Sequence, residues 1–564
     1  MRKISIRSHN GKEFTLEQSF VSVINPDKCV NCNSCREACP VQAIEEQQRT
    51  VCHICPECTE IKGITVNKMY SLPTETSCTT ACPLGISPQG YLTLTEKGKY
   101  EEAYELVWSK NPLSAICGHI CHHPCEDACK RGLLVDYPLS IRRIKRYLSE
   151  KVDYSPRPYP SIYSERIAIV GSGPAGLSAG HFLAQEGYDV TIFESAAQAG
   201  GMLMRGIPAF RLDRDVLQRE IDGLVKAGLK IKTGVTISQT DMSKLQEEYD
   251  AVILAVGKPY SKVLDLPGKR MNGVRNAMEY MQQVNNDMQD SRKAAQFYDS
   301  NGDVVVIGGG NVAFDTARTA LRLGAKTVTI VCPECGDDVP VHEEERKDAE
   351  DEGIRIIEAY SPKRYLGGAN IALTGVEFVA VSSCEKDDMG NVSFVFDEDD
   401  MMELPADQLI IAVGQYADQR WYDWNQENVF YAGDVSEQDN SVIAAMASGR
   451  KAAIKVDSFI RGRQIQDKLD HELHLAPSNQ RIYPFNNLKV ARPQRNCIPM
   501  EERTTTFNEV EKSWDDRSAK LEALSCMHCG YQKVDPDKCI GCGTCKTVCP
   551  AGDVISFVAI QEEV

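Results

Sequence analysis

Two stretches of the chain share one pattern, in which an apolar strand runs through a glycine-rich turn into a helix, and this pattern restricts the fold more than any other feature. The first reads ERIAIVGSGPAGLSAGHFLAQEGYDVTIFE and the second reads DVVVIGGGNVAFDTARTALRLGAKTVTIV. Strands that alternate with helices predict parallel sheets with helices on both faces. We therefore expect an α/β core of two nested Rossmann-like dinucleotide-binding domains.

The glycines of the first turn fit a dinucleotide phosphate. Gly171 and Gly173 allow the backbone to turn tightly and approach a pyrophosphate, while Gly176 allows helix and strand to pack closely. The helix N-terminus presents N–H groups to the phosphates. Glu194 ends the second strand, where a carboxylate accepts hydrogen bonds from ribose hydroxyls. A bare G-x-G-x-x-G is a weak signal, but strand, helix and acid together are specific.

The second turn, with Gly308 and Gly310, repeats this phosphate-binding pattern. Three shorter segments, AVILAVGKP, LIIAVGQ and VFYAGDVSEQ, each end a strand at a glycine. In the last, Asp434 follows Gly433 near the start of a helix, so its carboxylate can reach a ribitol hydroxyl while the helix end faces a flavin. Together these marks predict a flavin domain split between residues 159–280 and 425–470, with a nicotinamide domain at 281–424 inserted in it.

Cysteines dominate both ends of the chain. Of the 23 cysteines, thirteen lie between residues 29 and 129 and six between 526 and 549. CVNCNSCREACP and CIGCGTCKTVCP both have the spacing C-x2-C-x2-C-x3-C-P, which is typical of bacterial ferredoxins. A structural zinc site uses two separated pairs of ligands and fits less well. These runs predict [4Fe–4S] clusters bound by Cys29, Cys32, Cys35 and Cys39, and by Cys539, Cys542, Cys545 and Cys549.

The other clustered cysteines are less regular, and their pairing is ambiguous. Four recur at every fourth residue in CGHICHHPCEDAC, but Pro124 argues against one unbroken helix there. The pair in SCMHCG can join the run that follows it or needs outside ligands, for which Cys497 is conceivable. We expect three to five clusters, with further ligands among Cys52, Cys55, Cys58, Cys78, Cys82, Cys117, Cys121, Cys125, Cys129, Cys526 and Cys529.

Composition narrows the class of protein further. The net charge of −17 disfavours nucleic acid as a partner. No run approaches the roughly 18 consecutive apolar residues of a membrane helix, so we expect no membrane insertion. The basic N-terminus, MRKISIRSHN, lacks the apolar core of a secretory signal. A long chain with clustered cysteines and no such signal is typical of a cytoplasmic metalloprotein.

Six motifs, SCTTACP, NPLSAICGHIC, PCEDAC, GSGPAGLSAG, GGMLMRGIPAFRLDRDVL and IGGGNVAFDTARTALRLGA, carry a resemblance. Over about residues 75–465 the chain resembles the glutamate synthase small-subunit family of FAD and iron–sulfur oxidoreductases. Its flanks are reminiscent of the NADPH-binding large subunit of ferredoxin:NADP transhydrogenases and of subunits in electron-bifurcating complexes. Around the nested core we expect a ferredoxin-like [4Fe–4S] module at 1–65, a helical iron–sulfur domain at 66–158, an extension at 471–515 and a second ferredoxin-like module at 516–564.

The resemblance implies that hydride passes directly between a nicotinamide and the flavin, and that clusters carry single electrons away. No side chain is then needed as a catalytic acid or base. By resemblance, the FAD site includes Gly171, Gly173, Pro174, Ala175, Gly176, Glu194, Gly201, Met202, Arg211, Val235, Gly257, Gly433 and Asp434. The nicotinamide site in the second domain includes Gly308, Gly310, Asn311, Val312, Glu334 and Gly414.

The chain departs from the family at two points in the cysteine-rich region. Where relatives supply a Glu or Gln ligand to one cluster, SIRRIKRYL places Lys145, and a protonated lysine cannot ligate iron. Cys117 is the alternative ligand if this register is right. The family's leading Cys-x2-Cys is also absent at close range before SCTTACP, and the Cys52, Cys55 and Cys58 set is a candidate substitute.

The third departure concerns the choice of nucleotide. Aligning TVTIVC with DVTIFE places Cys332 where Glu194 stands, at the adenosine ribose. NADP-binding relatives follow this strand with two arginines, whereas Pro333 and Glu334 stand here, and Glu334 would repel a 2′-phosphate. This favours NAD(H) over NADP(H), although His342, Arg346 and Lys326 leave NADP binding open. Cys332 and Cys335 are best interpreted as reduced thiols, with a redox disulfide or a metal site as alternatives.

These features predict an oxidoreductase subunit that moves electrons between NAD(P)H and ferredoxin-type carriers or partner-subunit clusters. A hetero-oligomer is expected, because the clusters need an electron partner, and electron bifurcation in such a complex is conceivable. One alternative is an electron-wiring subunit whose nicotinamide site is inactive, which the altered 332–334 segment keeps open. A second alternative is a glutamate synthase small subunit.

Overall fold

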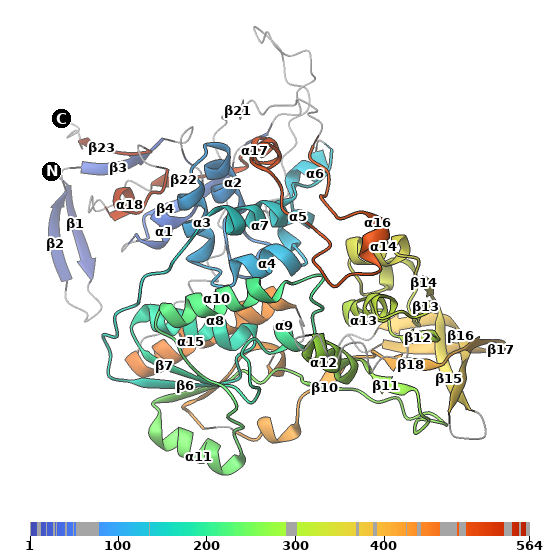
Figure 1. The fold of residues 1–564 in the computed structure, drawn as a ribbon. Helices are drawn as coiled ribbons and strands as arrows, with labels where there is room; N and C mark the ends of the chain where they lie inside the picture. The colour runs from blue at the N-terminus through green and yellow to red at the C-terminus, as the bar shows by residue number, and fades with distance from the viewer. Residues whose placement is uncertain are drawn as a thin grey trace, which may run out of the picture. The chain divides into compact units, whose positions relative to one another are not determined.

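The computed structural model describes residues 2–7, 13–18, 20–25, 29, 31–39, 42–48, 50–51, 78–134, 136–288, 302–367, 372–386, 392–424, 426–436, 441–462, 482–483, 492–534, 544–551 and 554–559. The chain divides into two compact units (Figure 1). The cysteine-rich unit comprises Met1–Ser155, Gln464–Arg495 and Ser513–Val564, and the nucleotide unit comprises Pro156–Arg463 and Asn496–Lys512. Each unit therefore gathers segments that lie far apart in the sequence.

The first parallel sheet of the nucleotide unit has five strands in the order β20-β9-β6-β7-β8. These are β6 (Arg166–Val170), β7 (Asp189–Phe193), β8 (Lys230–Lys232), β9 (Ala251–Leu254) and β20 (Val429–Tyr431). Helix α8 (Pro174–Glu186) follows β6 and packs against α15 (Val442–Arg461), while α10 (Arg214–Lys226) and α11 (Gln239–Glu248) lie between β7 and β9 in the chain. Because β20 joins this sheet only after the second sheet is complete, the first Rossmann-like domain is built from two separated stretches of the chain.

The second sheet is also parallel, with the order β11-β18-β12-β13-β14. Its strands are β11 (Val274–Asn276), β12 (Asp303–Ile307), β13 (Thr327–Val331), β14 (Arg355–Ile357) and β18 (Gln408–Ile411), and its helices are α12 (Ala277–Met288), α13 (Asn311–Arg322) and α14 (Glu343–Asp351). An antiparallel sheet of β15 (Tyr360–Gly367), β16 (Leu373–Lys386) and β17 (Val392–Pro405) connects β14 to β18. The two crossings between the domains pair as β10 (Tyr260–Ser261) and β19 (Gln415–Tyr416).

The core of each Rossmann-like domain explains why its central strands are continuous apolar runs. All four residues of β9 are buried, as are the last four of β6 and of β12. Helices on both faces exclude water from such strands, so apolar side chains are favoured at every position. Within the described ranges, no helix has the length and apolar character needed to cross a membrane.

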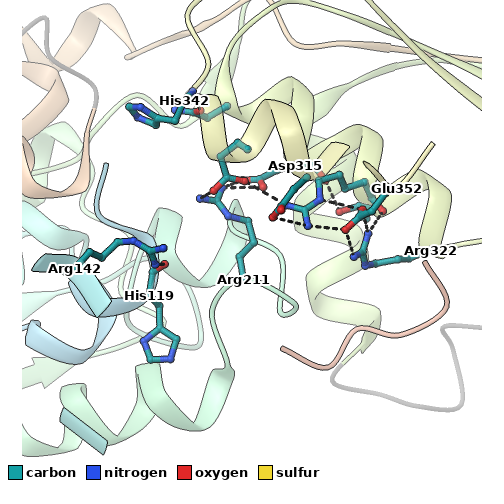
Figure 2. A network of polar contacts seen from close by, with 12 residues as sticks. His119, Arg142, Arg211, Asp315, Arg322, His342 and Glu352 are labelled. Carbon is teal, nitrogen blue, oxygen red and sulfur yellow. Dashed lines mark hydrogen bonds and ion pairs between the residues drawn. The ribbon is translucent and has the colours of Figure 1, made fainter. Parts of the chain in front are cut away.

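The middle of the cysteine-rich unit is helical. Its helices are α2 (Pro88–Glu96), α3 (Tyr100–Trp108), α4 (Ser114–Ile120), α5 (Pro124–Asp127), α6 (Lys130–Leu134), α7 (Ile141–Lys151) and α17 (Asp516–Leu524). The chain breaks between α4 and α5 just before Pro124, as expected from a residue without an N–H donor. Helix α4 packs closely on α7, because a Cβ on Gly118 would lie 2.7 Å from the Cα of Arg146. The Arg142 guanidinium donates to the carbonyl of His119 at 2.8 Å (Figure 2).

The two ferredoxin-like runs come together in one module. Strand β3 (Phe20–Ile24) pairs antiparallel with β23 (Ile555–Ala559), and β4 (Ile44–Gln48) pairs antiparallel with β22 (Gly530–Val534). Short helices α1 (Ser34–Glu37) and α18 (Thr544–Thr547) contact each other beside these strands. The shared core includes Ile24, Cys35, Ile44, Cys545 and Ile555. Each end of the chain therefore supplies half of one ferredoxin-like fold.

Three smaller pieces complete the described fold. In the cysteine-rich unit, β1 (Arg2–Arg7) forms a hairpin with β2 (Glu13–Gln18), and β5 (Thr50–Val51) pairs with β21 (Ile482–Tyr483). In the nucleotide unit, α16 (Met500–Arg503) belongs to the segment Asn496–Lys512. In that segment the N–H of Val510 donates to the carbonyl of Phe210, a residue of the first Rossmann-like domain, at 3.0 Å.

Candidate cofactor sites

The first glycine-rich loop is packed so tightly that side chains are excluded at two of its three glycines. Gly171 has a φ of +106°, and a Cβ there would lie 2.4 Å from the carbonyl oxygen of Ala255. A Cβ on Gly176 would lie 2.0 Å from the carbonyl oxygen of Gly171. Gly173 caps the N-terminus of α8, and no atom of another residue beyond its chain neighbours lies within 4 Å of a Cβ built on it. The loop therefore leaves the helix N-terminus open, as a bound pyrophosphate requires.

Glu194 closes the other side of this loop. Its Oε2 accepts hydrogen bonds from the N–H of Ser172 at 3.0 Å and from the Ser172 hydroxyl at 2.7 Å. Its Oε1 accepts from the N–H of Ala196 at 2.8 Å and from Arg205 at 3.2 Å. The carboxylate thus lies beside the glycine-rich loop at the carboxyl end of β7, where a ribose is bound in Rossmann-like folds.

Other predicted flavin residues surround the same helix N-terminus. Gly201 (φ +55°) lies so close that a Cβ on it would be 2.8 Å from the Cα of Gly173, and Met202 begins helix α9 (Met202–Arg205) there. Gly433 (φ +76°) begins the 3-10 turn that contains Asp434, and a Cβ on it would be 2.7 Å from the Cβ of Ala175. The N–H of Val235 donates to the carbonyl of Glu194 at 2.8 Å, and Gly257 follows β9 with a φ of +64°. These groups fit a flavin dinucleotide.

Arg211 bridges the two Rossmann-like domains. Its Nη1 lies 2.9 and 2.8 Å from the two carboxylate oxygens of Asp315 on α13, and its Nη2 lies 2.5 Å from Glu345 on α14 (Figure 2). Burial raises the pKa of Asp315 to about 6 while Arg211 lowers it. The resemblance places Arg211 at FAD, and this role stays a prediction, whereas its ion pairs join the flavin-domain loop to the nicotinamide domain.

A buried ionic network extends this bridge. Arg318 and Arg322 of α13 both bind Glu352, with nitrogen–oxygen distances between 2.7 and 3.0 Å. The Arg322 guanidinium also lies 3.9 Å from the centroid of the Phe210 ring and donates to the carbonyl of Thr506 at 3.1 Å. Nothing in the spacing of these residues along the sequence indicates that they meet in this network.

The second glycine-rich loop repeats the geometry of the first. Gly308 has a φ of +131°, and a Cβ on it would lie 2.4 Å from the carbonyl oxygen of Ala412. Gly310 caps α13, whose first residues are Asn311 and Val312, and no atom lies within 4 Å of a Cβ built there. Gly414 (φ +104°) follows β18 near Lys262. This loop too offers an open helix N-terminus at the carboxyl end of a parallel sheet.

Glu334 lies at the ribose corner of the second loop. Its Oε2 is 3.1 Å from the position of a Cβ on Gly309, the residue that corresponds to Ser172. Cys332 directly follows β13 and is fully buried, and its Sγ donates to the carbonyl of Glu334 at 3.6 Å. Burial raises the pKa of Cys332 to about 12. The strand end is thus filled by a neutral thiol, and the carboxylate comes from Glu334.

The basic residues near Glu334 in the sequence form other contacts or lie away from this corner. Arg346 binds Glu350 at 3.1 Å and also binds Glu358. Lys326 precedes β13 and is exposed at the amino end of the sheet, the end opposite to the glycine-rich loop. The N–H of His342 donates to Asn311 at 3.4 Å. Cys332 is buried, Cys335 is exposed, and these two thiols form no disulfide.

Four thiols surround one cavity in the cysteine-rich unit. Cys78, Cys129, Cys526 and Cys529 line it, together with Asn31, Thr79, Gln89 and Leu92 among others. Burial, reinforced by the other three thiols, holds the pKa of Cys78 well above its ordinary value. A second cavity is lined by Cys29, Cys32, Cys35 and Cys549, and Asn31 lies in its wall as well. In this second set three thiols come from the first ferredoxin run and one comes from the second.

A third group of thiols surrounds a lysine. Burial lowers the pKa of Lys145 on α7, but Cys121, Cys117, Cys125 and Cys82 outweigh it and keep that pKa above its ordinary value. Lys145 is only 4% exposed, so its ammonium group lies among sulfur atoms inside the helical domain. Lys145 therefore lies among these thiols, and Cys117 stays the candidate fourth ligand beside Cys82, Cys121 and Cys125.

The chemistry of these thiols fits iron–sulfur clusters. Buried thiols keep their protons unless a metal replaces them, because a metal ion deprotonates the cysteines that bind it. In the described residues, no three His, Cys, Asp or Glu side chains are arranged to hold a single metal ion. A four-iron cube takes its thiolates from around a larger body than one ion. Cys39 and Cys545 lie in the ferredoxin-like core, and the predicted ligands Cys52, Cys55, Cys58, Cys539 and Cys542 lie outside the described residues.

Comparison with protein families agrees with this geometry. Residues 165–449, half of the chain, match the pyridine nucleotide-disulphide oxidoreductase model. The chain belongs to this family. Residues 72–155 match a model described as dihydropyrimidine dehydrogenase domain II, 4Fe–4S cluster, and residues 22–45 and 533–555 match 4Fe–4S binding domains. No family match covers the pair Cys526 and Cys529.

Three curated relatives share most of their length with this chain. The NADP(+)-dependent formate dehydrogenase subunit beta of Moorella thermoacetica is 30% identical over 83% of this chain and 72% of its own length. The NAD-dependent dihydropyrimidine dehydrogenase subunit PreT of Escherichia coli K12 is 30% identical over 74% of this chain and 98% of its own. The NADPH-Fe(3+) oxidoreductase subunit beta of Geobacter sulfurreducens is 27% identical over 80% of this chain and 75% of its own length. Together with the family match, they confirm an NAD(P)H-dependent oxidoreductase with a flavin and nicotinamide core and [4Fe–4S] domains.

Proposed function

We propose that the chain binds FAD at the first glycine-rich loop and NAD(H) at the second, and passes electrons through its clusters to a partner redox subunit or a ferredoxin-type carrier in a cytoplasmic, hetero-oligomeric complex. Bound flavin takes up hydride from a nicotinamide and gives up single electrons. The protein contributes position rather than acid–base chemistry: two open helix N-termini for phosphates, and Glu194 and Glu334 at the two ribose corners.

The preference for NAD(H) rests on Glu334. Its carboxylate beside Gly309 can accept hydrogen bonds from a free 2′-hydroxyl, whereas a 2′-phosphate there would bring two negative groups together. Arg346 of α14 is already paired with Glu350 and Glu358. Helix α14 begins with Glu343, Glu344 and Glu345, which adds to the negative charge of the segment after β13.

The proposal of a partner subunit has two supports. Three relatives that are matched over 72–98% of their own length are named as subunits, and their names include both NAD and NADP specificities. The cluster-binding thiols of this chain also exceed what hydride exchange between two nucleotides needs. Electrons that leave the flavin one at a time through such clusters require an acceptor outside the chain.

Transient kinetics test the nucleotide preference. The full chain, purified anaerobically with its flavin, is mixed with NADH or NADPH, and flavin absorbance is followed by stopped flow. We expect rapid bleaching by NADH and slow bleaching by NADPH. Glu334→Arg should lower the rate of flavin bleaching per unit concentration of NADH about tenfold, as expected from a lost hydrogen bond to a charged group. The same variant should raise the corresponding rate with NADPH.

The control for this variant is Asp337→Arg, which makes the same charge change at an exposed site three residues further on. It should leave the ratio of NADH to NADPH efficiency within about a factor of two, since screened surface charges contribute little. Faster bleaching of the unaltered chain by NADPH would overturn the preference. Absence of bleaching by either nucleotide, with flavin present, would favour an electron-wiring subunit.

A further inference from the structure

The pair Cys526 and Cys529 stands apart from the ferredoxin run that follows it in the sequence. In the nearest ferredoxin-type cavity the wall is formed by Cys29, Cys32, Cys35 and Cys549, without this pair. Cys526 and Cys529 instead line the cavity that also contains Cys78 and Cys129. The four thiols come from three places: the segment before α2, the link between α5 and α6, and the segment after α17.

The local backbone of this pair is that of a cluster-binding loop. His528, between the two cysteines, has a φ of +50°, and its N–H donates to the thiol of Cys526. Asn31 holds the same place in Cys29-x-x-Cys32, with a φ of +54° and its N–H donating to the Cys29 Sγ at 3.4 Å. A left-handed backbone is unfavourable for a residue other than glycine, so its recurrence at the same position indicates a shared purpose.

Helix α17 holds the pair against the helical domain by polar contacts. Glu522 is fully buried and accepts from the N–H of Ser140 at 2.7 Å and from Arg492 at 2.8 Å. Arg131 donates to the carbonyl of Ser525 at 2.8 Å, one residue before Cys526. These contacts dock the segment with its thiols facing Cys78 and Cys129.

We propose that Cys526 and Cys529 complete a four-thiol site with Cys78 and Cys129, that this site holds one [4Fe–4S] cluster, and that the cluster is adjacent to the one held by Cys29, Cys32, Cys35 and Cys549. Asn31 lies in the wall of both cavities. The pair therefore replaces the Cys-x2-Cys that is missing before SCTTACP. This inference deepens the proposed function, because it makes the C-terminal segment part of the electron path out of the helical domain.

Thiol protection tests the assignment on the full anaerobic chain. The holoprotein is treated with iodoacetamide and digested, and alkylated cysteines are identified by mass spectrometry. In the double variant Cys526→Ser, Cys529→Ser we expect Cys78 and Cys129 to become alkylated, while Cys82, Cys121 and Cys125 stay protected. Iron should fall by one cluster, four atoms per chain.

Two further variants keep the test decisive. Cys78→Ser should expose Cys129, Cys526 and Cys529 together and lower iron by the same amount. It tests the same site from another segment of the chain, so the test still decides if the double variant folds poorly. Cys335→Ser, Cys384→Ser alters two exposed cysteines of the nucleotide unit and should change neither iron content nor protection. If the first double variant instead exposes Cys545 and Cys549, the pair belongs to the C-terminal run and the inference is wrong.

The outcome is independent of the nucleotide preference. Flavin and nicotinamide bind in the nucleotide unit, so bleaching by NADH should persist in the double variant while the helical domain loses its cluster. Loss of bleaching in the unaltered chain would count against the proposed function alone. Unchanged iron and protection in the double variant would count against this inference alone.

Discussion

The two glycine-rich loops of the nucleotide unit share one backbone geometry, but the carboxylate beside each loop comes from a different position in the sequence. In the first, Glu194 directly follows the strand, and its carboxylate accepts hydrogen bonds from Ser172. In the second, the buried Cys332 follows the strand, and the carboxylate beside the loop comes from Glu334, two residues later. A residue beyond the strand can therefore take the place of the strand-end acid, provided that the chain turns back toward the loop.

The third position of the two motifs differs as well. Gly176 approaches the loop so closely that a Cβ would meet the carbonyl oxygen of Gly171 at 2.0 Å. The second loop has Ala313 at the equivalent position, and its side chain is buried in the core. Helix and strand therefore approach more closely in the flavin domain than in the nicotinamide domain.

The largest effect is expected for Gly176→Ala. The added methyl group must displace backbone atoms of the loop, so we expect a loss of about 3 kcal/mol in stability and of most bound flavin. Flavin absorbance per chain and thermal unfolding measure the two effects. The reciprocal change Ala313→Gly should cost only about 1 kcal/mol through helix propensity and keep the flavin. Retention of flavin by Gly176→Ala would contradict the tighter approach in the first loop.

The second largest effect is expected for Arg211→Met, because this variant removes the ion pairs that join the flavin domain to the nicotinamide domain. It leaves Asp315 buried without this cation, while Glu345 keeps Arg318 as a partner at 3.3 Å. Removing one partner of a buried ion pair costs about 3–5 kcal/mol, and partial exposure of this site reduces the expected loss to about 2 kcal/mol. Urea unfolding measures it. Adding Asp315→Asn to this variant should restore part of the loss, and an additive result would show that the two residues are not coupled.

A smaller effect concerns pH. The pKa of Asp315 in the folded chain is raised to about 6 by burial, against an ordinary value near 3.9. Because the folded state holds this proton more tightly, the contribution of Asp315 to stability is full at low pH and falls as pH rises from about 4 to 6. The unfolding free energy of the unaltered chain minus that of Asp315→Asn should therefore decrease across this range. An increase over the same range would mean that Arg211 dominates and lowers the pKa.

The smallest effect is expected at the cysteines of the second corner. Burial holds Cys332 as a neutral thiol, since its pKa is raised to about 12, whereas Cys335 is exposed. Iodoacetamide at pH 8 should alkylate Cys335 and spare Cys332. The variants Cys332→Ala and Cys335→Ser should bleach with NADH at rates within about twofold of the unaltered chain, as expected for surface or volume-conserving changes. A large loss in either variant would revive a redox role for the pair.

The iron–sulfur region shows how far local sequence reaches. Each C-x2-C-x2-C-x3-C-P run predicts its own cluster, and the break before Pro124 is predicted correctly from the missing N–H donor. The pairing of β3 with β23 is not predictable in this way, because it joins residues more than five hundred positions apart. The same applies to Cys526, whose cavity partners lie in a different part of the chain.

The sequence alone determined the class of chemistry: the two dinucleotide loops, the clustered thiols and the family. These are local patterns, in which a few residues at fixed spacing must meet the same cofactor wherever the fold places them. The tertiary structure decided the partnerships, namely that the chain ends share one ferredoxin-like module, that Cys526 faces Cys78, and that Arg211 joins α13. Such contacts depend on strand pairing and packing between distant segments, and the burial that makes them favourable arises only when those segments fold together.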